Sequence, residues 1–196
     1  MKRFLCAAVL ASVVLAGFSS VVAAASNDGL GTSQLRSGNA KIIEAFRFAY
    51  ARSTTFRALV ETIESSRDIV YLEAKGPEPR PFRSSLQLAS GNGPVRYLRI
   101  YVDVRQPRQL VAQLAHELQH ATEVVGRLDI VDDRSMRHLY EQIGYRSCAS
   151  RSGECWETRQ AQVIERLVVA EIHSVRTTNL VAAHDEGLNL QPGGGR

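Results

Sequence analysis

Residues 107–126 read PRQLVAQLAHELQHATEVVG, and His116-Glu117-Leu118-Gln119-His120 within them forms an HExxH motif. Proline suits the first position of a helix and glycine the position after its end, so the stretch predicts one continuous helix. At 3.6 residues per turn, His116 and His120 lie one above the other on the same face. Because two imidazoles at this spacing can bind one cation, the motif predicts a metal site.

The apolar residues of this helix fall on the side opposite the motif. With His116 at zero degrees and about 100° per residue, the far side carries Leu110, Val111, Leu114, Leu118, Ala121 and Val125. The motif side carries Gln109, Gln113, His116, His120 and Glu123. Glu117 lies about 100° around the helix axis from His116. A general base that flanks a metal-bound water would have to lie at this position. The alternative is a solvated helix face that happens to carry two histidines.

A catalytic zinc site normally takes three protein ligands, so one more must come from elsewhere in the chain. We exclude Glu123 as that ligand because a straight helix carries it about 10 Å along the axis from His116. We expect Glu123 to be an exposed carboxylate, with a hydrogen bond to a ligand histidine as the alternative. The downstream candidates are His138, Glu141, Glu154, Glu157, Glu165, Glu171 and His173.

A helix predicted over Trp156–His173 favours Glu157 among these candidates. Its apolar residues Ala161, Ile164, Val168 and Ile172 fall within about 60° of Glu157, at the N-terminal end of a buried stripe. A buried carboxylate needs a cation to stay ionised. We therefore expect Glu157 to be the third ligand, with a structural ion pair as the alternative and Glu171 as the rival in the same helix.

Two cysteines stand directly before this helix. In an exported chain, Cys148 and Cys155 are expected to form a disulfide that closes the loop before Glu157, and a pair of free thiols is the alternative.

The first 25 residues have the features of a secretory signal peptide. Lys2 and Arg3 precede an apolar run that ends in Ala23-Ala24-Ala25 before Ser26. An uncleaved anchor is the alternative. We expect an exported bacterial protein, periplasmic or secreted, with no stable membrane anchor after cleavage. Residues 26–176 would form one domain and residues 177–196 a disordered polar tail.

The charge of the chain argues against nucleic acid as a partner. The formal net charge is +4, and removal of two basic residues with the leader lowers it to +2. The arginines are spread along the chain without a basic run or interleaved aromatic residues. The oligomeric state stays open.

Periodicity predicts an α+β fold, with a small and mainly antiparallel sheet packed against the motif helix and a later helix that bears the glutamate. Alternation in the strand 95–104 places four residues on its buried face: Leu98, Ile100, Val102 and Val104. If this strand lies at the sheet edge, it could bind an extended substrate. Helices are expected at 38–51, 54–66 and 134–143, the last capped by Asp132 or Asp133, and strands at 69–74, 85–89 and 95–104.

The order of helix, small sheet, HExxH helix, connecting helix and glutamate helix resembles the minimal core of the zincin metallopeptidases, in particular the gluzincin branch. The resemblance covers residues 69–173, and its specific parts are HELQH and the Trp156-Glu157-Thr158 entry to the last helix. The chain also resembles small exported bacterial HExxH proteins of undefined substrate. The resemblance implies His116, His120 and Glu157 as zinc ligands and Glu117 as general base. The NExxSD-type context of the family's third ligand is absent here.

These observations predict a zinc-dependent hydrolase with one zinc ion that cleaves amide bonds in peptides or proteins, with cell-wall peptides as one substrate class. The alternative is a secreted binding module that zinc stabilises and that cleaves nothing. Oxyanion stabilisation needs a further donor, and the sequence does not rank the four candidates Tyr140, Tyr145, Arg146 and His173.

Overall fold

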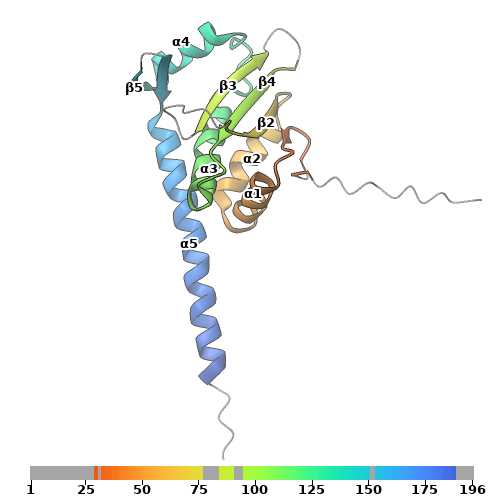
Figure 1. The fold of residues 1–196 in the computed structure, drawn as a ribbon, viewed down its shortest axis with the longest axis vertical. Helices are drawn as coiled ribbons and strands as arrows, with labels where there is room; N and C mark the ends of the chain where they lie inside the picture. Colours follow the sequence, from red (N-terminus) through yellow and green to blue (C-terminus); the bar gives the residue numbers. More distant parts are fainter. Residues whose placement is uncertain (1–28, 31, 77–83, 91–94, 151–152, 189–196) are drawn as a thin grey trace, which may run out of the picture.

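The computed structural model describes residues 29–30, 32–76, 84–90, 95–150 and 153–188 (Figure 1). Five helices and six strands follow in the order β1 (Leu35–Arg36), α1 (Ala40–Arg52), α2 (Thr54–Glu64), β2 (Ile69–Ala74), β3 (Ser84–Ser90), β4 (Tyr97–Val102), α3 (Pro107–Val124), α4 (Asp133–Ile143), β5 (Tyr145–Ser150), β6 (Gly153–Glu157) and α5 (Arg159–Leu188). The leader predicted for residues 1–25 lies outside the described residues. No helix in the described ranges is long and apolar enough to cross a membrane.

The α+β class is confirmed, but the prediction of a mainly antiparallel sheet was wrong. The main sheet has the order β1-β2-β4-β3, in which β1, β2 and β4 run parallel and β3 pairs antiparallel with β4. Helices α1 and α2 connect β1 to β2 and provide the long crossover that parallel pairing requires. Strand β4 is internal, so it does not meet the condition, a place at the sheet edge, under which it could bind an extended substrate. The edge beside β4 is β3.

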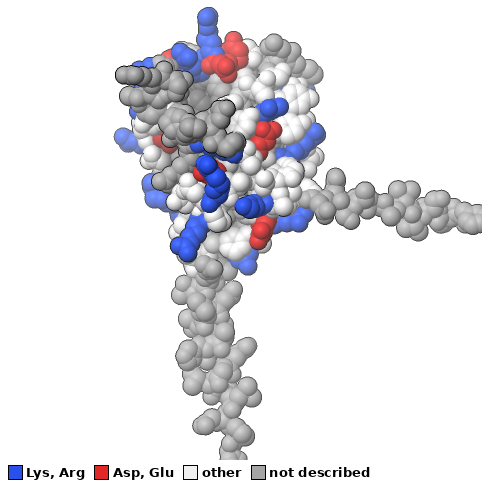
Figure 2. Space-filling model, viewed as in Figure 1, with Lys and Arg blue, Asp and Glu red and all other residues white. Residues whose placement is uncertain are grey.

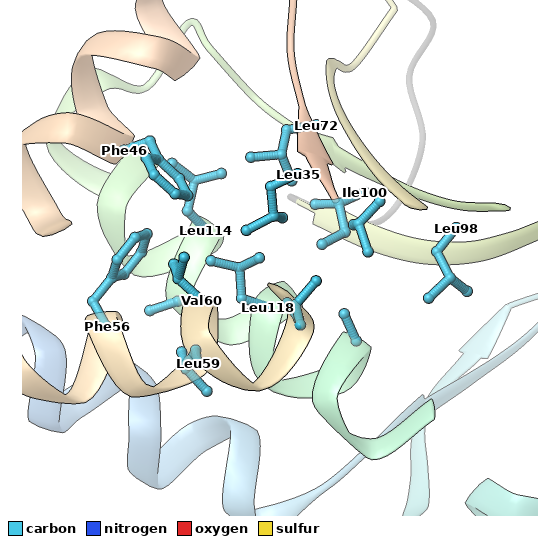
Figure 3. Close-up of a cluster of buried hydrophobic side chains, with 14 of the residues drawn as sticks. Leu35, Phe46, Phe56, Leu59, Val60, Leu72, Leu98, Ile100, Leu114 and Leu118 are labelled. Atoms are coloured by element: carbon cyan, nitrogen blue, oxygen red, sulfur yellow. The ribbon is translucent and has the colours of Figure 1, made fainter. Parts of the chain in front are cut away.

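Helix α3 is held against this sheet by leucines. Figure 3 shows Leu114 and Leu118 of α3 between Leu72, Leu98 and Ile100 of the sheet and aromatic residues of the first two helices. Leu98, Ile100 and Val102 are fully buried, as the alternation in β4 predicts. The side of α3 that carries the motif is therefore turned away from the sheet, toward α5.

The helix boundaries follow from capping residues. The side chains of Asn39, Ser53 and Asp132 cap α1, α2 and α4. The start predicted for the last helix was wrong by three residues, because Gly153–Glu157 forms a strand. Thr158 then accepts a hydrogen bond from the backbone N–H of Ala161 through its hydroxyl, which begins α5 at Arg159 (Oγ1 to N 3.1 Å).

Helix α5 packs along α3 and projects well beyond the rest of the domain (Figure 1). It continues to Leu188, so the segment from Thr177 that we predicted to be a disordered tail is helical as far as that residue. Glu171 ties α5 to the start of α2, where it accepts hydrogen bonds from the hydroxyls of Ser53 and Thr55 at 2.5 and 2.6 Å.

Basic and acidic side chains are interspersed over the face seen in Figure 2.

A buried ion pair fixes the far end of α3. Arg96 pairs with Asp68, and both side chains are almost fully buried. The Arg96 guanidinium also donates to the backbone carbonyls of Val124, Arg127 and Ile130, at and just after the C-terminus of α3. A cation at this end is favoured by the helix dipole, so the pair anchors the helix that carries the motif.

Replacement of Arg96 by Met should therefore lower the free energy of unfolding by about 3–5 kcal/mol, because Asp68 and three carbonyls lose their buried partner. Arg99, which is half-exposed and 3.8 Å from Glu73, provides the control, and Arg99→Met should cost about 1 kcal/mol or less. Urea denaturation of both variants measures the difference. Equal losses would show that the buried pair does not anchor α3.

Candidate metal centre

Two imidazoles and one carboxylate converge between α3 and the end of β6. His116 and His120 lie one turn apart on α3, with their ring centroids 4.9 Å from each other. The Nε2 atoms of His116 and His120 are 3.2 and 3.4 Å from the two carboxylate oxygens of Glu157. One ligand atom from each of the three residues lies within 4.8 Å of the others. The structure thus brings together the three residues that the sequence suggested as ligands.

The second nitrogen of each imidazole meets another carboxylate. Nδ1 of His116 is 3.0 Å from Glu165 of α5, and Nδ1 of His120 is 2.9 Å from Glu123. We expected Glu123 to be exposed, and this was wrong, because its side chain is only 10% exposed. The alternative, a hydrogen bond to a histidine of the motif, is what the structure has. A carboxylate at Nδ1 keeps a proton on that nitrogen and orients the ring, which leaves Nε2 as the atom that would bind a metal after it loses its proton.

This arrangement concentrates negative charge. Burial lowers the pKa of His120, but hydrogen bonds to Glu123 and Glu157 outweigh it and raise the pKa to about 10. Burial raises the pKa of Glu157, but its hydrogen bonds to His116 and His120 outweigh this and lower the pKa to about 2. Burial also lowers the pKa of His116, but Glu157 and Glu117 outweigh it, so the pKa of this imidazole is raised as well. A divalent cation would supply the same charge as two protons.

The distances to Glu157 are compatible with one cation between the three side chains. Ligands about 2.0–2.2 Å from zinc at a tetrahedral angle are roughly 3.4 Å apart. The two imidazole nitrogens are 3.2 and 3.4 Å from Glu157, each from a different carboxylate oxygen, and one ligand atom of each residue lies within 4.8 Å of the others. Neutral Nε2 atoms and a carboxylate are all electron-pair donors and repel one another unless a cation lies between them. Two nitrogens and one oxygen suit zinc.

Gly144 allows the Glu157 backbone to approach the end of α4. A Cβ at position 144 would lie 2.6 Å from the carbonyl oxygen of Glu157 and 3.0 Å from that of Tyr140. Only glycine fits this close approach without a shift of the backbone. The corner between α4 and β5 therefore helps to determine where the Glu157 carboxylate reaches the two histidines.

Glu117 is buried beside the three residues and connects them to the edge strand. Its side chain is 4% exposed, and burial raises its pKa, which the nearby imidazoles and a hydrogen bond with the Ser84 side chain oppose. Ser84 is the first residue of β3 and pairs with Val102. The carboxylate of Glu117 is thus held between the motif helix and the sheet edge.

Tyr140 lies behind His120 and supports the ring. Its hydroxyl donates to the His120 carbonyl oxygen at 3.3 Å, and its ring packs edge-on against the imidazole. Burial and the nearby charges of Glu123 and Glu117 raise its pKa well above the usual value. The other three candidates for oxyanion stabilisation have different surroundings. Tyr145 is hydrogen-bonded to Gln162, and the Arg146 guanidinium lies over the ring of Trp156. His173 is exposed on α5.

The predicted disulfide falls in the β5–β6 hairpin. Cys155 is disulfide-bonded, and Cys148 is the residue opposite it in the strand register. The side chain of Cys148 lies outside the described residues, so the pairing of these two cysteines stays a prediction. A bond at this position would tie the strand that ends in Glu157 to its neighbour.

Comparison of the chain with protein-family models, with characterised proteins and with solved structures yields no match. The interpretation of the site therefore rests on its geometry.

The sequence did not lead us to predict the roles that three residues have in this centre: Ser84, Thr158 and Glu165. Ser84 is brought to Glu117 by strand pairing, which a single sequence does not reveal. Thr158 could have been found as a helix cap, since it precedes the apolar stripe by three residues, as a capping residue does. Its hydroxyl also donates to Glu123 at 2.8 Å. Glu165 was one of several candidate ligands and instead contacts Nδ1 of His116.

Replacement of Glu123 by Gln should weaken zinc binding by about 10- to 100-fold with little change in secondary structure, because His120 loses the carboxylate that orients it. Competition with a chromophoric chelator measures the affinity, and circular dichroism checks the fold. Glu141→Gln, at an exposed position on α4, is the matched control. Unchanged affinity in the Glu123 variant would contradict the orienting role.

Proposed function

We propose that the chain is a zinc-dependent hydrolase that cleaves amide bonds in exported peptides or proteins. One observation carries the proposal: the Nε2 atoms of two histidines one helix turn apart converge on the Glu157 carboxylate, while both Nδ1 atoms are already bound by other carboxylates. Among the described residues, this cluster offers three protein ligands. Three ligands are characteristic of catalytic zinc, whereas structural zinc takes four.

Zinc bound by His116, His120 and Glu157 would act as a Lewis acid, lowering the pKa of water and polarising a carbonyl group. Glu117 is the general base in this proposal. It follows His116 directly, is shielded from solvent, and has a raised pKa, which suits a group that must accept a proton and then release it to the leaving amine. The Ser84 side chain holds Glu117 by a hydrogen bond and would limit its rotation.

The position of β3 supports an extended peptide as the substrate. Strand β3 ends the sheet, so one side of it has backbone N–H and C=O groups without a strand partner among the described elements. A peptide that pairs with this side would run past Ser84 and therefore past Glu117. Peptides in extended conformation, including cell-wall peptides, are the substrate class that this edge could accept.

The general-base role predicts a specific loss in Glu117→Gln. The amide keeps the size of the side chain but cannot accept the proton, so hydrolysis should fall by at least about 100-fold while zinc content stays the same. Cleavage of a fluorogenic peptide library gives the rates, and mass spectrometry of the metal-loaded protein gives the zinc content. Equal rates in wild type and variant would reject Glu117 as the base.

The ligand set predicts zinc contents for three further variants. The purified wild type should hold one zinc ion per chain, and His116→Ala, His120→Ala and Glu157→Ala should each lose most of it. The control His138→Ala, on the exposed side of α4, should keep it. Full zinc occupancy in Glu157→Ala would assign the third ligand elsewhere. Normal zinc content without hydrolysis of any library peptide would favour the zinc-stabilised binding module instead.

A further inference from the structure

A pocket lies beside the candidate metal centre, on the outer side of Glu123. It has a volume of about 870 Å³ and is bounded by the corner between α4 and β5 and by the first two turns of α5. Glu123 and Thr158 form its inner wall. Because Glu123 contacts Nδ1 of His120, the pocket adjoins the side of that ring opposite Glu157.

Two arginines without ion pairs line this pocket. Arg159 and Arg166 are seven residues apart, so they stand on the same side of α5, two turns from each other. Both are exposed, and in the described part of the chain no carboxylate pairs with either guanidinium. Guanidinium groups are the side chains best suited to bidentate binding of a carboxylate.

Tyr145 of β5 adds a neutral donor to the lining of the pocket. Its hydroxyl oxygen accepts a hydrogen bond from Nε2 of Gln162 at 2.6 Å. A tyrosine hydroxyl can accept and donate at the same time, so the O–H of Tyr145 is left to donate to a ligand. The lining thus offers a hydroxyl in addition to two cations.

Glu123, the acidic residue of the pocket, already has hydrogen-bond partners at its carboxylate. Glu123 receives hydrogen bonds from the hydroxyl of Thr158 at 2.8 Å and from Gln119 at 3.4 Å, and it contacts His120. The groups left open for a ligand are therefore donors, and two of them are cationic.

We propose that this pocket binds a carboxylate group. The carboxylate could belong to a peptide, as its C-terminus or an acidic side chain, or to a free organic acid, since both present the same planar acceptor to Arg159 and Arg166. The inference that the carboxylate belongs to a peptide rests on the proposed hydrolase function. The inference that the pocket binds a carboxylate is independent of that function. A ligand in the pocket would lie against Glu123 and so next to the group that orients His120.

Calorimetric titration of the metal-free protein tests the proposal independently of catalysis. The probes are N-acetyl-alanyl-alanine, the same dipeptide as its C-terminal amide, and glutarate. Both acids should bind, and the amide should bind at least about tenfold more weakly, because it lacks the charge that the arginines recognise. Arg159→Gln combined with Arg166→Gln should weaken binding of the acids by at least about tenfold, and Tyr145→Phe by a smaller factor.

Arg134→Gln, an exposed arginine on α4 outside the pocket, is the matched control and should leave the affinity unchanged. Thermal melts establish that the double variant is folded, since both replaced side chains are exposed. Tighter binding of the dipeptide acid than of glutarate would identify a peptide carboxylate as the ligand, and the reverse order a free acid. No binding of either acid, equal binding of acid and amide, or unchanged binding in the double variant would overturn the proposal.

Discussion

The contact between the Glu157 carboxylate and the Nε2 atoms of His116 and His120 is the interaction on which the rest of the structure depends. It joins α3, which the core leucines hold against the sheet, to the strand that leads into α5. Electron-pair donors do not gather in a buried place without positive charge between them. In the metal-free protein the neighbouring carboxylates raise the pKa of both imidazoles, and a single divalent ion would supply positive charge between the same three side chains.

Much of the surrounding fold serves to hold these three side chains in place. Arg96 anchors the C-terminal end of α3, and Glu171 ties α5 to α2. Thr158 begins α5 and donates to Glu123, so one side chain links the helix start to the carboxylate that contacts His120. Carboxylates on both imidazoles would orient the rings before a metal bound, which is how protein metal sites gain affinity and fixed orientation.

The sequence predicted those parts of the centre that depend on local spacing. The HExxH histidines, the apolar face of α3 and the buried residues of β4 follow from periods of 3.6 and 2, which any single sequence reveals. Glu157 was chosen for its place in a helix, yet it ends a strand, so the structure brings the predicted residue to the two histidines from a setting that we did not predict. Strand direction, the edge position of β3 and the contact of Ser84 with Glu117 depend on pairing between distant segments. Alternation in β4 is the same for parallel and antiparallel neighbours, and this is why the sheet was mispredicted.

X-ray absorption spectroscopy of the zinc-loaded protein tests the central claim most directly, because it reports the atoms around the metal without reference to activity. We predict one zinc ion with two imidazole nitrogens and one carboxylate oxygen at about 2.0–2.2 Å, and with the remaining position taken by an oxygen from solvent. The imidazole signal should fall in His120→Ala. A spectrum with sulfur ligands, with four protein ligands, or with zinc held only by solvent oxygens would contradict the assignment of His116, His120 and Glu157.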